Sequence, residues 1–201
     1  PEWHAMRLGC ITASEADCLL VDGAKKKRPN LLLPDEFGAG AETYAMKLLN
    51  ELLTMLPSDS GTSWEMEFGH EYEAEARSRL PEVLGLTAEQ ITTPAFILHP
   101  ELSLIGCSPD ALIDSKDVRA GAEIKCRCSE AHTRLLMEDL VASRNGDRAE
   151  VPDANVAQVQ FSLWVSQAEL WYYVSFAPAH DESTDLIVLE GNPLEDAGTL
   201  Q

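Results

Sequence analysis

Two short segments decide the fold of this chain: Ser108-Pro109-Asp110 and, after twelve intervening residues, Glu123-Ile124-Lys125. If they belong to adjacent strands joined by a tight turn, Asp110 and Glu123 fall close to opposite one another. Residues two apart on a strand project to the same face, so the Glu and Lys of the second segment point together while the intervening Ile points into the core. The pattern predicts two carboxylates and an ammonium group on one side of a sheet.

Three charged groups on one face of a strand pair are costly unless something compensates them. Two carboxylates within about 5 Å of each other raise each other's pKa unless a cation lies between them. A pair of oxygen donors suits a hard cation such as Mg²⁺, with Mn²⁺ able to substitute, and Mg²⁺ accepts phosphate oxygens from a substrate. A nearby lysine would orient or deprotonate the attacking water, or stabilise charge on the transition state.

This charged set therefore predicts phosphodiester hydrolysis. The bare pattern also fits a surface Asp in a turn beside an ordinary Glu–Lys pair across two strands, so the surrounding residues must decide.

The length of 201 residues and the apolar content of 45% predict one domain, residues 1–201, with a single core. No apolar run approaches the roughly 18 residues that span a bilayer, and residues 1–4 do not resemble a signal peptide. We therefore expect a cytoplasmic protein with no membrane partner. Five cysteines, an odd number, suit a reducing compartment. Cys126 and Cys128 are expected to share a strand face and pack as small apolar groups.

The net charge of −19 argues at first against a nucleic-acid partner, because phosphate binding favours Lys and Arg. The charge is unevenly distributed: residues 181–201 hold six acids and no base, whereas residues 25–28 are a compact basic run. That run is either a solvated loop or a contact to the DNA backbone. A metal-dependent nuclease also concentrates acids where divalent cations neutralise them, so the charge does not decide.

Hydrophobic periodicity and turn signals predict helices that alternate with short strands. A helix start is expected at residues 12–15 with Thr12 or Ser14 as its cap, and a loop over 24–40. The expected helices are 41–56, 64–80, 130–143 and 154–166. The expected strands are 95–98, 104–107, 111–114, 122–127, 170–176 and 185–189, with the turn of the central pair at 115–117. Helices flanking a central mixed β-sheet make an α/β (α+β) domain.

Five motifs, in order along the chain, resemble those of the lambda exonuclease family of phage recombination exonucleases. They are Trp3-His4-x-x-Arg7-Leu8-Gly9-x-Ile11-Thr12-Ala13-Ser14, Phe68-Gly69-His70-Glu71-Tyr72-Glu73-x-x-Ala76-Arg77, Cys107-Ser108-Pro109-Asp110, Glu123-Ile124-Lys125-Cys126, and Ala157-Gln158-Val159-Gln160-Phe161-Ser162-Leu163-Trp164-Val165 with Trp171-Tyr172-Tyr173.

The resemblance implies a restriction-endonuclease-like PD-(D/E)xK core. It implies Mg²⁺-dependent 5′-to-3′ digestion of one strand of linear double-stranded DNA to mononucleotides, which leaves a 3′ single-stranded overhang for recombination. It also implies a ring-shaped homotrimer that works with a single-strand annealing recombinase.

The resemblance also assigns roles to individual residues. It implies that Asp110, Glu123 and the backbone carbonyl of Ile124 bind metal, that Lys125 positions the water, and that Glu73 supports a second metal. It implies that Arg7, Ser14, Ser108 and Gln158 hold the 5′-phosphate.

Physical chemistry agrees with the phosphate site, since Arg offers a planar fork of donors and Ser and Gln offer neutral ones. The alternatives are structural: a helix cap for Ser14, a turn for Ser108, a solvated helix position for Gln158 and a structural ion pair for Arg7. The Glu-rich helix that carries Glu73 would then simply be solvated.

Some features depart from the family or leave its function open. Arg127 stands where the family usually has Pro, and a family wedge that splits the terminal base pair would fall near Met66. Trp3, Trp164 and Trp171 are expected in the core. Two other functions stay open: a structure- or site-specific endonuclease on the same fold, and an acidic, non-catalytic DNA mimic or interaction protein.

Overall fold

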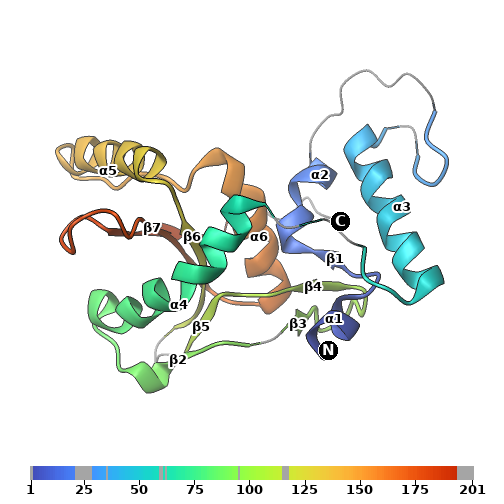
Figure 1. Ribbon diagram of the computed structural model, residues 1–201, viewed down its shortest axis with the longest axis horizontal. Helices are drawn as coiled ribbons and strands as arrows, with labels where there is room; N and C mark the ends of the chain where they lie inside the picture. Colours follow the sequence, from blue (N-terminus) through green and yellow to red (C-terminus); the bar gives the residue numbers. More distant parts are fainter. Residues whose placement is uncertain are drawn as a thin grey trace.

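The computed structural model describes residues 2–20, 29–34, 36–58, 61, 63–94, 96–114 and 118–193. The basic run 25–28, the predicted turn 115–117 and the last part of the acidic tail, 194–201, lie outside the described residues, as do the side chains of Trp3 and His4. Helices cover both faces of a mixed sheet, and a second, smaller sheet lies beside it (Figure 1). The predicted fold class, a mixed sheet flanked by helices, is confirmed.

The larger sheet has five strands in the order β2-β5-β6-β7-β8. Their bounds are β2 (Ile91–Thr92), β5 (Ala111–Asp114), β6 (Arg119–Cys126), β7 (Leu170–Phe176) and β8 (Leu186–Gly191). β6 runs parallel to β7, whereas every other neighbouring pair is antiparallel. β6 and β7 are buried along most of their length, as expected of apolar strands covered on both faces.

One helix covers one face of this sheet and two helices cover the other. α4 (Trp64–Leu84) packs Ala76 and Leu80 against alternate residues of β5, β6 and β7. On the opposite face, α5 (Ser129–Ser143) and α6 (Asp153–Ser166) pack around the buried Trp171 and Tyr173 of β7. Because side chains alternate along a strand, this layering directs Ile124 toward α4 and its neighbours on β6 toward α6.

The smaller sheet has the order β1-β4-β3, with bounds β1 (Ile11–Thr12), β4 (Ile105–Cys107) and β3 (Ile97–Leu98). α6 packs on this sheet as well, through Val165 and Trp164, and so joins the two sheets. The first parallel pair, β1 with β4, brings the N-terminal segment beside the residues that precede Asp110. The motif that contains Arg7 and the motif Cys107-Ser108-Pro109-Asp110 therefore lie near each other in space.

The remaining elements belong to the N-terminal part of the chain, except for one 3-10 helix that follows α4. They are α1 (Glu2–Arg7), the 3-10 helix η1 (Ala13–Glu15), α2 (Asp17–Leu20), α3 (Ala39–Thr54) and a second 3-10 helix, η2 (Ala88–Gln90). Thr12 is at the N-cap position of η1, as predicted, but its side chain makes no capping hydrogen bond. Thr12 Oγ1 instead lies 3.2 Å from Ser14 Oγ and 3.4 Å from Tyr44 Oη.

Two further expectations need correction. The predicted loop 24–40 is two residues too long at its end, because α3 starts at Ala39. α4 does not stop before Pro81 but continues to Leu84. A proline inside a helix removes one backbone hydrogen bond, but the packing of Leu80 and Leu84 against the sheet holds the last turn in place.

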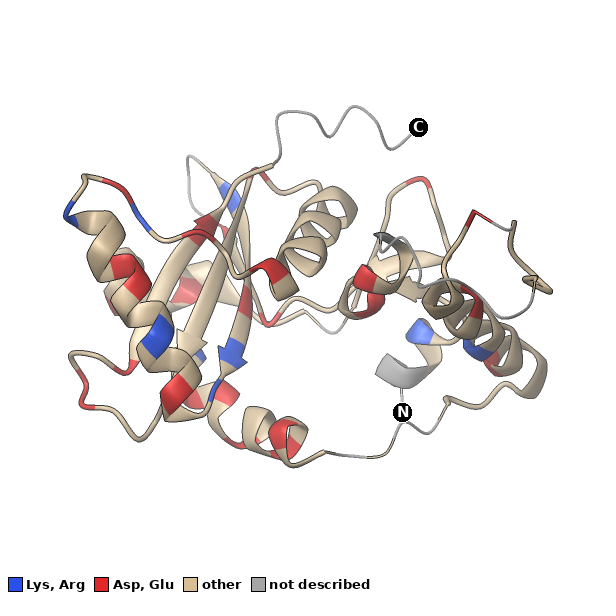
Figure 2. Cartoon of the chain, turned by 90° about the horizontal axis from the view of Figure 1, so that it is seen from above, with Lys and Arg blue, Asp and Glu red and all other residues tan. Residues whose placement is uncertain are grey.

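Acidic residues are spread over the surface helices, and basic residues are fewer (Figure 2). Among the described residues, no helix is both long enough and apolar enough to cross a membrane.

Candidate active site

One pocket of about 1070 Å³ lies where α4, β6, α6 and the N-terminal segment meet. All nine residues with a predicted site role line it: Arg7, Ser14, Glu73, Ser108, Asp110, Glu123, Ile124, Lys125 and Gln158. These residues come from segments spread between Arg7 and Gln158, and the fold brings them together. The structure gives their positions, and their chemical roles stay predictions.

Asp110 and Glu123 lie close together at one end of the β5–β6 pair, as the spacing predicts. Ala111 at the start of β5 pairs with Ala122 on β6, and the backbone N–H of Asp110, just before β5, donates to the Ala122 carbonyl at 3.1 Å. Oδ2 of Asp110 accepts a 2.6 Å hydrogen bond from the backbone N–H of Ile124. Both carboxylates therefore belong to one rigid section of sheet.

Lys125 completes the set on the same face as Glu123. Its Nζ lies 2.7 Å from Oε1 of Glu123, whose side chain is only 6% exposed. Ile124, between them, points the other way into the core under α4. The predicted alternation along β6 is confirmed, and the alternative of a Glu–Lys pair across two strands is wrong because both residues lie on β6.

Both carboxylates are unfavourable as anions in this environment. Burial raises the pKa of Asp110 well above its usual range, and repulsion from Glu123 raises it further. Burial also raises the pKa of Glu123, although Lys125 and a hydrogen bond from Gln158 act against that shift. Burial alone would lower the pKa of Lys125, but its attraction to Glu123 and Asp110 outweighs burial and leaves the pKa raised. The lysine is therefore an ammonium donor at neutral pH.

α4 supplies a third carboxylate and holds it near the first two. Arg77 forms an ion pair with Glu73 one turn earlier on the helix, and its Nε donates a 2.7 Å hydrogen bond to the backbone carbonyl of Asp110. The charge of Glu73 acts on both Asp110 and Glu123 and raises the pKa of each. Arg77 thus fixes the Glu-rich helix to the strand end that carries Asp110, and this helix is more than a solvated surface element.

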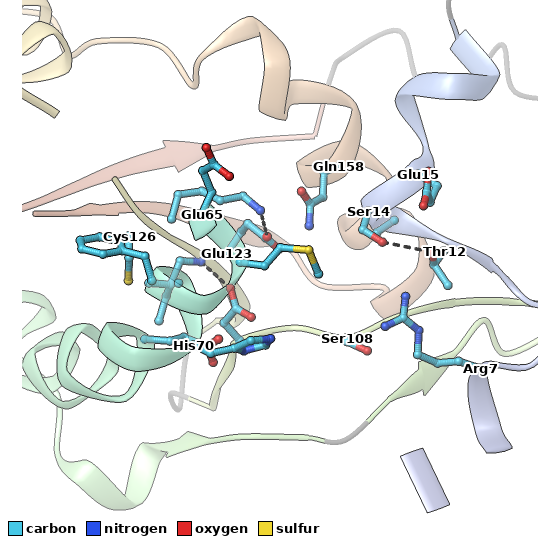
Figure 3. Close-up of a pocket in the computed structure, with 18 of the residues that line it drawn as sticks. Arg7, Thr12, Ser14, Glu15, Glu65, His70, Ser108, Glu123, Cys126 and Gln158 are labelled. Carbon is cyan, nitrogen blue, oxygen red and sulfur yellow. Dashed lines mark hydrogen bonds and ion pairs between the residues drawn. The ribbon is translucent and has the colours of Figure 1, made fainter. Parts of the chain in front are cut away.

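The four residues predicted to hold a phosphate lie in the other part of the pocket. Figure 3 shows the hydroxyl of Ser14 and the amide of Gln158 directed into the pocket on the side where the Arg7 guanidinium lies, with Ser108 between Arg7 and Glu123. Burial lowers the pKa of Arg7, and Tyr44 and Glu51 partly offset this effect. Arg7 keeps its charge under all ordinary conditions.

The donors present fit a hard divalent cation. Two buried carboxylates that repel each other are what a cation would relieve, and carboxylate and carbonyl oxygens are the ligands that Mg²⁺ prefers. Among the described residues, no three His, Cys, Asp or Glu side chains converge closely enough to hold a metal by themselves. The Ile124 carbonyl, water and substrate oxygens would have to complete the coordination, which is usual for Mg²⁺.

The cysteine expectation is partly wrong. β6 ends at Cys126, so Cys128 no longer shares its strand face and is exposed just before α5. Burial raises the pKa of the Cys126 thiol to about 11, so this thiol stays protonated at neutral pH and is a poor metal ligand. The core assignment of Trp171 is confirmed, whereas Trp164 is partly buried and packs against the core.

Residue-by-residue reasoning on the sequence missed several polar and aromatic residues that line the pocket. Lys47 lies 3.2 Å from Glu15 on the Arg7 side. Arg127, noted only as a departure from the family, donates to Tyr173 Oη at 2.9 Å and to Asn155 Oδ1 at 2.8 Å. The positive charge of Arg127, two residues beyond Lys125 and on the same strand end, was the available signal.

The fold and the placement of the Asp–Glu–Lys set define the class: a PD-(D/E)xK domain. Residues 2–169 match the YqaJ-like viral recombinase domain, and the chain belongs to that family. No protein with a curated description matches the sequence.

Solved structures with the same fold include an alkaline exonuclease, LHK-Exo, from Laribacter hongkongensis, with 22% identity, a TM-score of 0.73, and coverage of 97% of this chain and 83% of that one. The same enzyme in complex with dAMP gives 21% identity, a TM-score of 0.73 and the same coverage of 97% and 83%. A phage related exonuclease from Haemophilus somnus 129PT gives 12% identity and a TM-score of 0.63, over 93% of this chain and 86% of that one. At these identities, the solved structures establish the fold.

Proposed function

We propose that this protein is a Mg²⁺-dependent 5′-to-3′ exonuclease that degrades one strand of linear double-stranded DNA to mononucleotides and leaves a 3′ single-stranded overhang. One observation carries the proposal: the charged set of Asp110, Glu123 and Lys125 shares a single pocket with Arg7, Ser14, Ser108 and Gln158. A hydrolytic centre beside a phosphate-binding group sets the distance from the strand end at which cleavage occurs. Membership of a viral recombinase family supports the same function.

The hydrolytic part of the pocket has two tasks: to hold the cation and to position the attacking water. Asp110 and Glu123, with the Ile124 carbonyl, would hold the cation, which supplies Lewis-acid stabilisation of negative charge on the phosphate oxygens. Lys125 donates hydrogen bonds at the same face, where it orients the attacking water and stabilises charge that develops in the transition state. Glu73 would support a second cation through water from its place beside Arg77.

The phosphate part of the pocket recognises the strand end. Arg7 offers a planar fork of donors, and Ser14, Ser108 and Gln158 offer neutral hydrogen-bond donors around it. A 5′-phosphate bound there aligns the next phosphodiester with the carboxylates. Gln158 links the two parts, since its hydrogen bond to Glu123 lowers the pKa of that carboxyl.

The decisive experiment follows the products of linear duplex DNA carrying a label at either the 5′ or the 3′ end. We expect early release of 5′-labelled mononucleotides with Mg²⁺ or Mn²⁺, faster digestion of 5′-phosphorylated ends, no activity in EDTA and intact closed circular DNA. Asp110→Asn should abolish the activity, whereas Asp114→Asn, at the far, exposed end of β5, should leave it unchanged. Discrete fragments or cleavage of closed circles would show an endonuclease instead.

We also propose that the protein acts as a homotrimer that encircles DNA and cooperates with a single-strand annealing recombinase. The likeness to the lambda exonuclease family supports this assembly. An apolar surface at the end of α3 also supports a protein contact, because Leu53, Met55 and Leu56 are 76%, 68% and 64% exposed. Sedimentation equilibrium of the purified chain tests it, with a threefold chain mass expected and a monomer mass contradicting it.

A further inference from the structure

Three polar side chains on one face of α3 each bind the N-terminal segment that carries the predicted phosphate site. Tyr44, Lys47 and Glu51 are three and four residues apart along the helix, so they share that face. The Tyr44 hydroxyl accepts a 3.0 Å hydrogen bond from the backbone N–H of Thr12. Lys47 Nζ lies 3.2 Å from Glu15 Oε1. All three residues of α3 also line the pocket, so the helix holds the N-terminal segment along the pocket wall.

Glu51 joins two loops through its carboxylate. The residue is buried, with 8% of its surface exposed. Oε2 accepts a 3.1 Å hydrogen bond from the backbone N–H of Gly9, and Oε1 accepts a 3.0 Å hydrogen bond from the backbone N–H of Ser58. Gly9 has a φ of 68°, and a Cβ there would overlap the side chain of Leu52. The turn that follows Arg7 is therefore packed tightly on α3, and Glu51 fixes it there.

The carboxylate of Glu51 also acts on the Arg7 guanidinium. Burial lowers the pKa of Arg7, whereas Tyr44 and then Glu51 raise it. A partly buried cation requires a counter-charge, and Glu51 supplies one when no phosphate is bound. The same negative charge repels a phosphate that binds to Arg7. Two backbone N–H groups need only an oxygen to accept them, so hydrogen bonding alone does not explain why the acceptor is charged.

The reaction proposed for this pocket makes the strength of phosphate binding important. Water loses a proton and attacks the phosphorus of the second nucleotide, and the 3′-oxygen of the first nucleotide leaves and gains a proton. The released mononucleotide therefore keeps the 5′-phosphate that Arg7 holds, and it must leave before the shortened strand can take its place. Binding that is equally strong throughout the reaction lowers KM without raising kcat. A phosphate site without an opposing charge would therefore retain its product.

We propose that Glu51 positions Arg7 and limits how tightly the pocket holds a terminal 5′-phosphate, so that the mononucleotide product is released. This role rests on the proposed function and deepens it, because it assigns the control of product release to one residue. The hydrogen bonds to Gly9 and Ser58 fix the backbone that follows Arg7. The charge weakens phosphate binding at the guanidinium. Glu51 is thus a positioning residue that acts on the phosphate through Arg7.

Binding of DNA ends, measured separately from cleavage, tests the role of Glu51. Fluorescence anisotropy in Ca²⁺ would compare a linear duplex with 5′-phosphate ends and the same duplex with 5′-hydroxyl ends. Glu51→Gln removes the charge and keeps an oxygen that accepts a hydrogen bond, so it should bind the phosphorylated duplex about fivefold more tightly than the wild type does. Its affinity for the 5′-hydroxyl duplex should stay within about twofold of the wild type. With Arg7→Ala already present, Glu51→Gln should change neither affinity.

Two further variants separate charge from hydrogen bonding. Glu51→Asp keeps the charge on a shorter side chain, so it should not bind the phosphorylated duplex more tightly than the wild type does. Glu138→Gln is the matched control, because Glu138 is an exposed glutamate on α5 and is not among the residues that line the pocket. Its affinity for both duplexes should equal that of the wild type. With Mg²⁺, thymidine 5′-monophosphate should inhibit Glu51→Gln about fivefold more strongly than it inhibits Glu138→Gln.

An unchanged affinity of Glu51→Gln for the phosphorylated duplex would overturn the role of Glu51, and so would a gain in Glu51→Asp. A loss of affinity for both duplexes in Glu51→Gln would also overturn it and show that Glu51 only supports the fold. A wild type that binds both duplexes equally would overturn the phosphate site together with this role. Cleavage by the wild type, assayed in parallel with Mg²⁺, shows separately whether the proposed function holds.

Discussion

The carboxylate of Asp110 accepts a 2.6 Å hydrogen bond from the backbone N–H of Ile124, which lies between the other two members of the charged set. This bond crosses from β5 to β6 and fixes Asp110 relative to Glu123 and Lys125. Hydrogen bonds to an ionised acceptor are among the stronger ones, yet burial and the neighbouring Glu123 still leave the pKa of Asp110 raised. The site is therefore preorganised and lacks sufficient positive charge without a cation.

Replacement of Asp110 by Asn should separate stability from activity. Without metal, the change removes a buried negative charge that Glu123 repels, so the free energy of unfolding should rise by about 1 kcal/mol. Activity with Mg²⁺ should fall by at least about 1000-fold, because a cation ligand is lost. Urea unfolding in EDTA and in Mg²⁺ measures the first effect. Added Mg²⁺ should stabilise the wild type and leave Asp110→Asn unchanged.

Lower stability of Asp110→Asn in EDTA would show that the carboxylate is a structural anion and contradict the charge argument. Asp114→Asn, which changes an exposed carboxylate on the same strand, should change neither the unfolding free energy nor the response to Mg²⁺ by a measurable amount.

Replacement of Lys125 by Ala should impair the chemical step more than binding. Loss of a donor that stabilises the transition state lowers the rate by about 100- to 1000-fold. The affinity for DNA in Ca²⁺ should change by less than about threefold, because Lys125 is held by Glu123 at 2.7 Å. Single-turnover rates and anisotropy titrations measure the two quantities. Equal losses in rate and affinity would instead assign Lys125 to simple phosphate binding.

The parts of the structure that follow short-range periodicity could be predicted from the sequence. β5 and β7 have the predicted bounds, and α6 begins within one residue of its predicted start. The twelve-residue spacing between Asp110 and Glu123 was enough to predict that they lie close together, because register in a short hairpin follows from the turn. The roles of these residues are a separate question that mutation must answer.

Other parts of the fold could not be predicted from the local sequence pattern. β1 and β2 have two residues each, too few to show an alternation, and both depend on strands distant in sequence. The predicted helix 64–80 stops before Pro81, but α4 continues to Leu84, which packs against the core. The meeting of Arg7 with Gln158 in one pocket requires the parallel pairing of β1 with β4 and the packing of α6 on both sheets. Only the family resemblance anticipated that meeting.

Replacement of Arg7 by Ala should abolish the preference for a 5′-phosphate. Hydrogen bonds to a charged group contribute about 2 kcal/mol, which corresponds to roughly 30-fold. The ratio of initial rates on 5′-phosphorylated and 5′-hydroxyl ends should therefore fall to about one. Arg7→Lys should keep part of the preference, because it retains the charge and loses the planar fork.

Arg148→Ala is the control, since Arg148 is an exposed arginine paired with Asp139 on α5 and does not line the pocket. Its preference for phosphorylated ends should match that of the wild type. A normal preference in Arg7→Ala would show that Arg7 does not bind the 5′-phosphate. An equal loss of rate on 5′-phosphorylated and 5′-hydroxyl ends would indicate a structural role for Arg7.

Buried His132 should make folding stability depend on pH. Its Nδ1 lies 2.9 Å from Ser175 Oγ and its Nε2 lies 2.8 Å from the Thr184 carbonyl, between α5 and the segment that joins β7 to β8. Burial lowers its pKa from the ordinary 6.5, with a smaller contribution from His180, whereas Asp185 acts in the opposite direction. Below about pH 6.5 the unfolded chain therefore binds a proton that the folded chain does not.

The contribution of His132 to the free energy of unfolding is fully present above pH 6.5. Below that pH it falls by about 1.4 kcal/mol per pH unit, and it levels off below the lowered pKa of the folded state. Urea unfolding of the wild type and His132→Gln between pH 5 and 8 measures this contribution as a difference in the slope of the unfolding free energy against pH. His132→Gln should be less stable at pH 8, because the amide fits the two partners less well, and the gap should narrow as the pH falls. A gap that stays constant across the range would show that His132 titrates at the same pH in the folded and unfolded states.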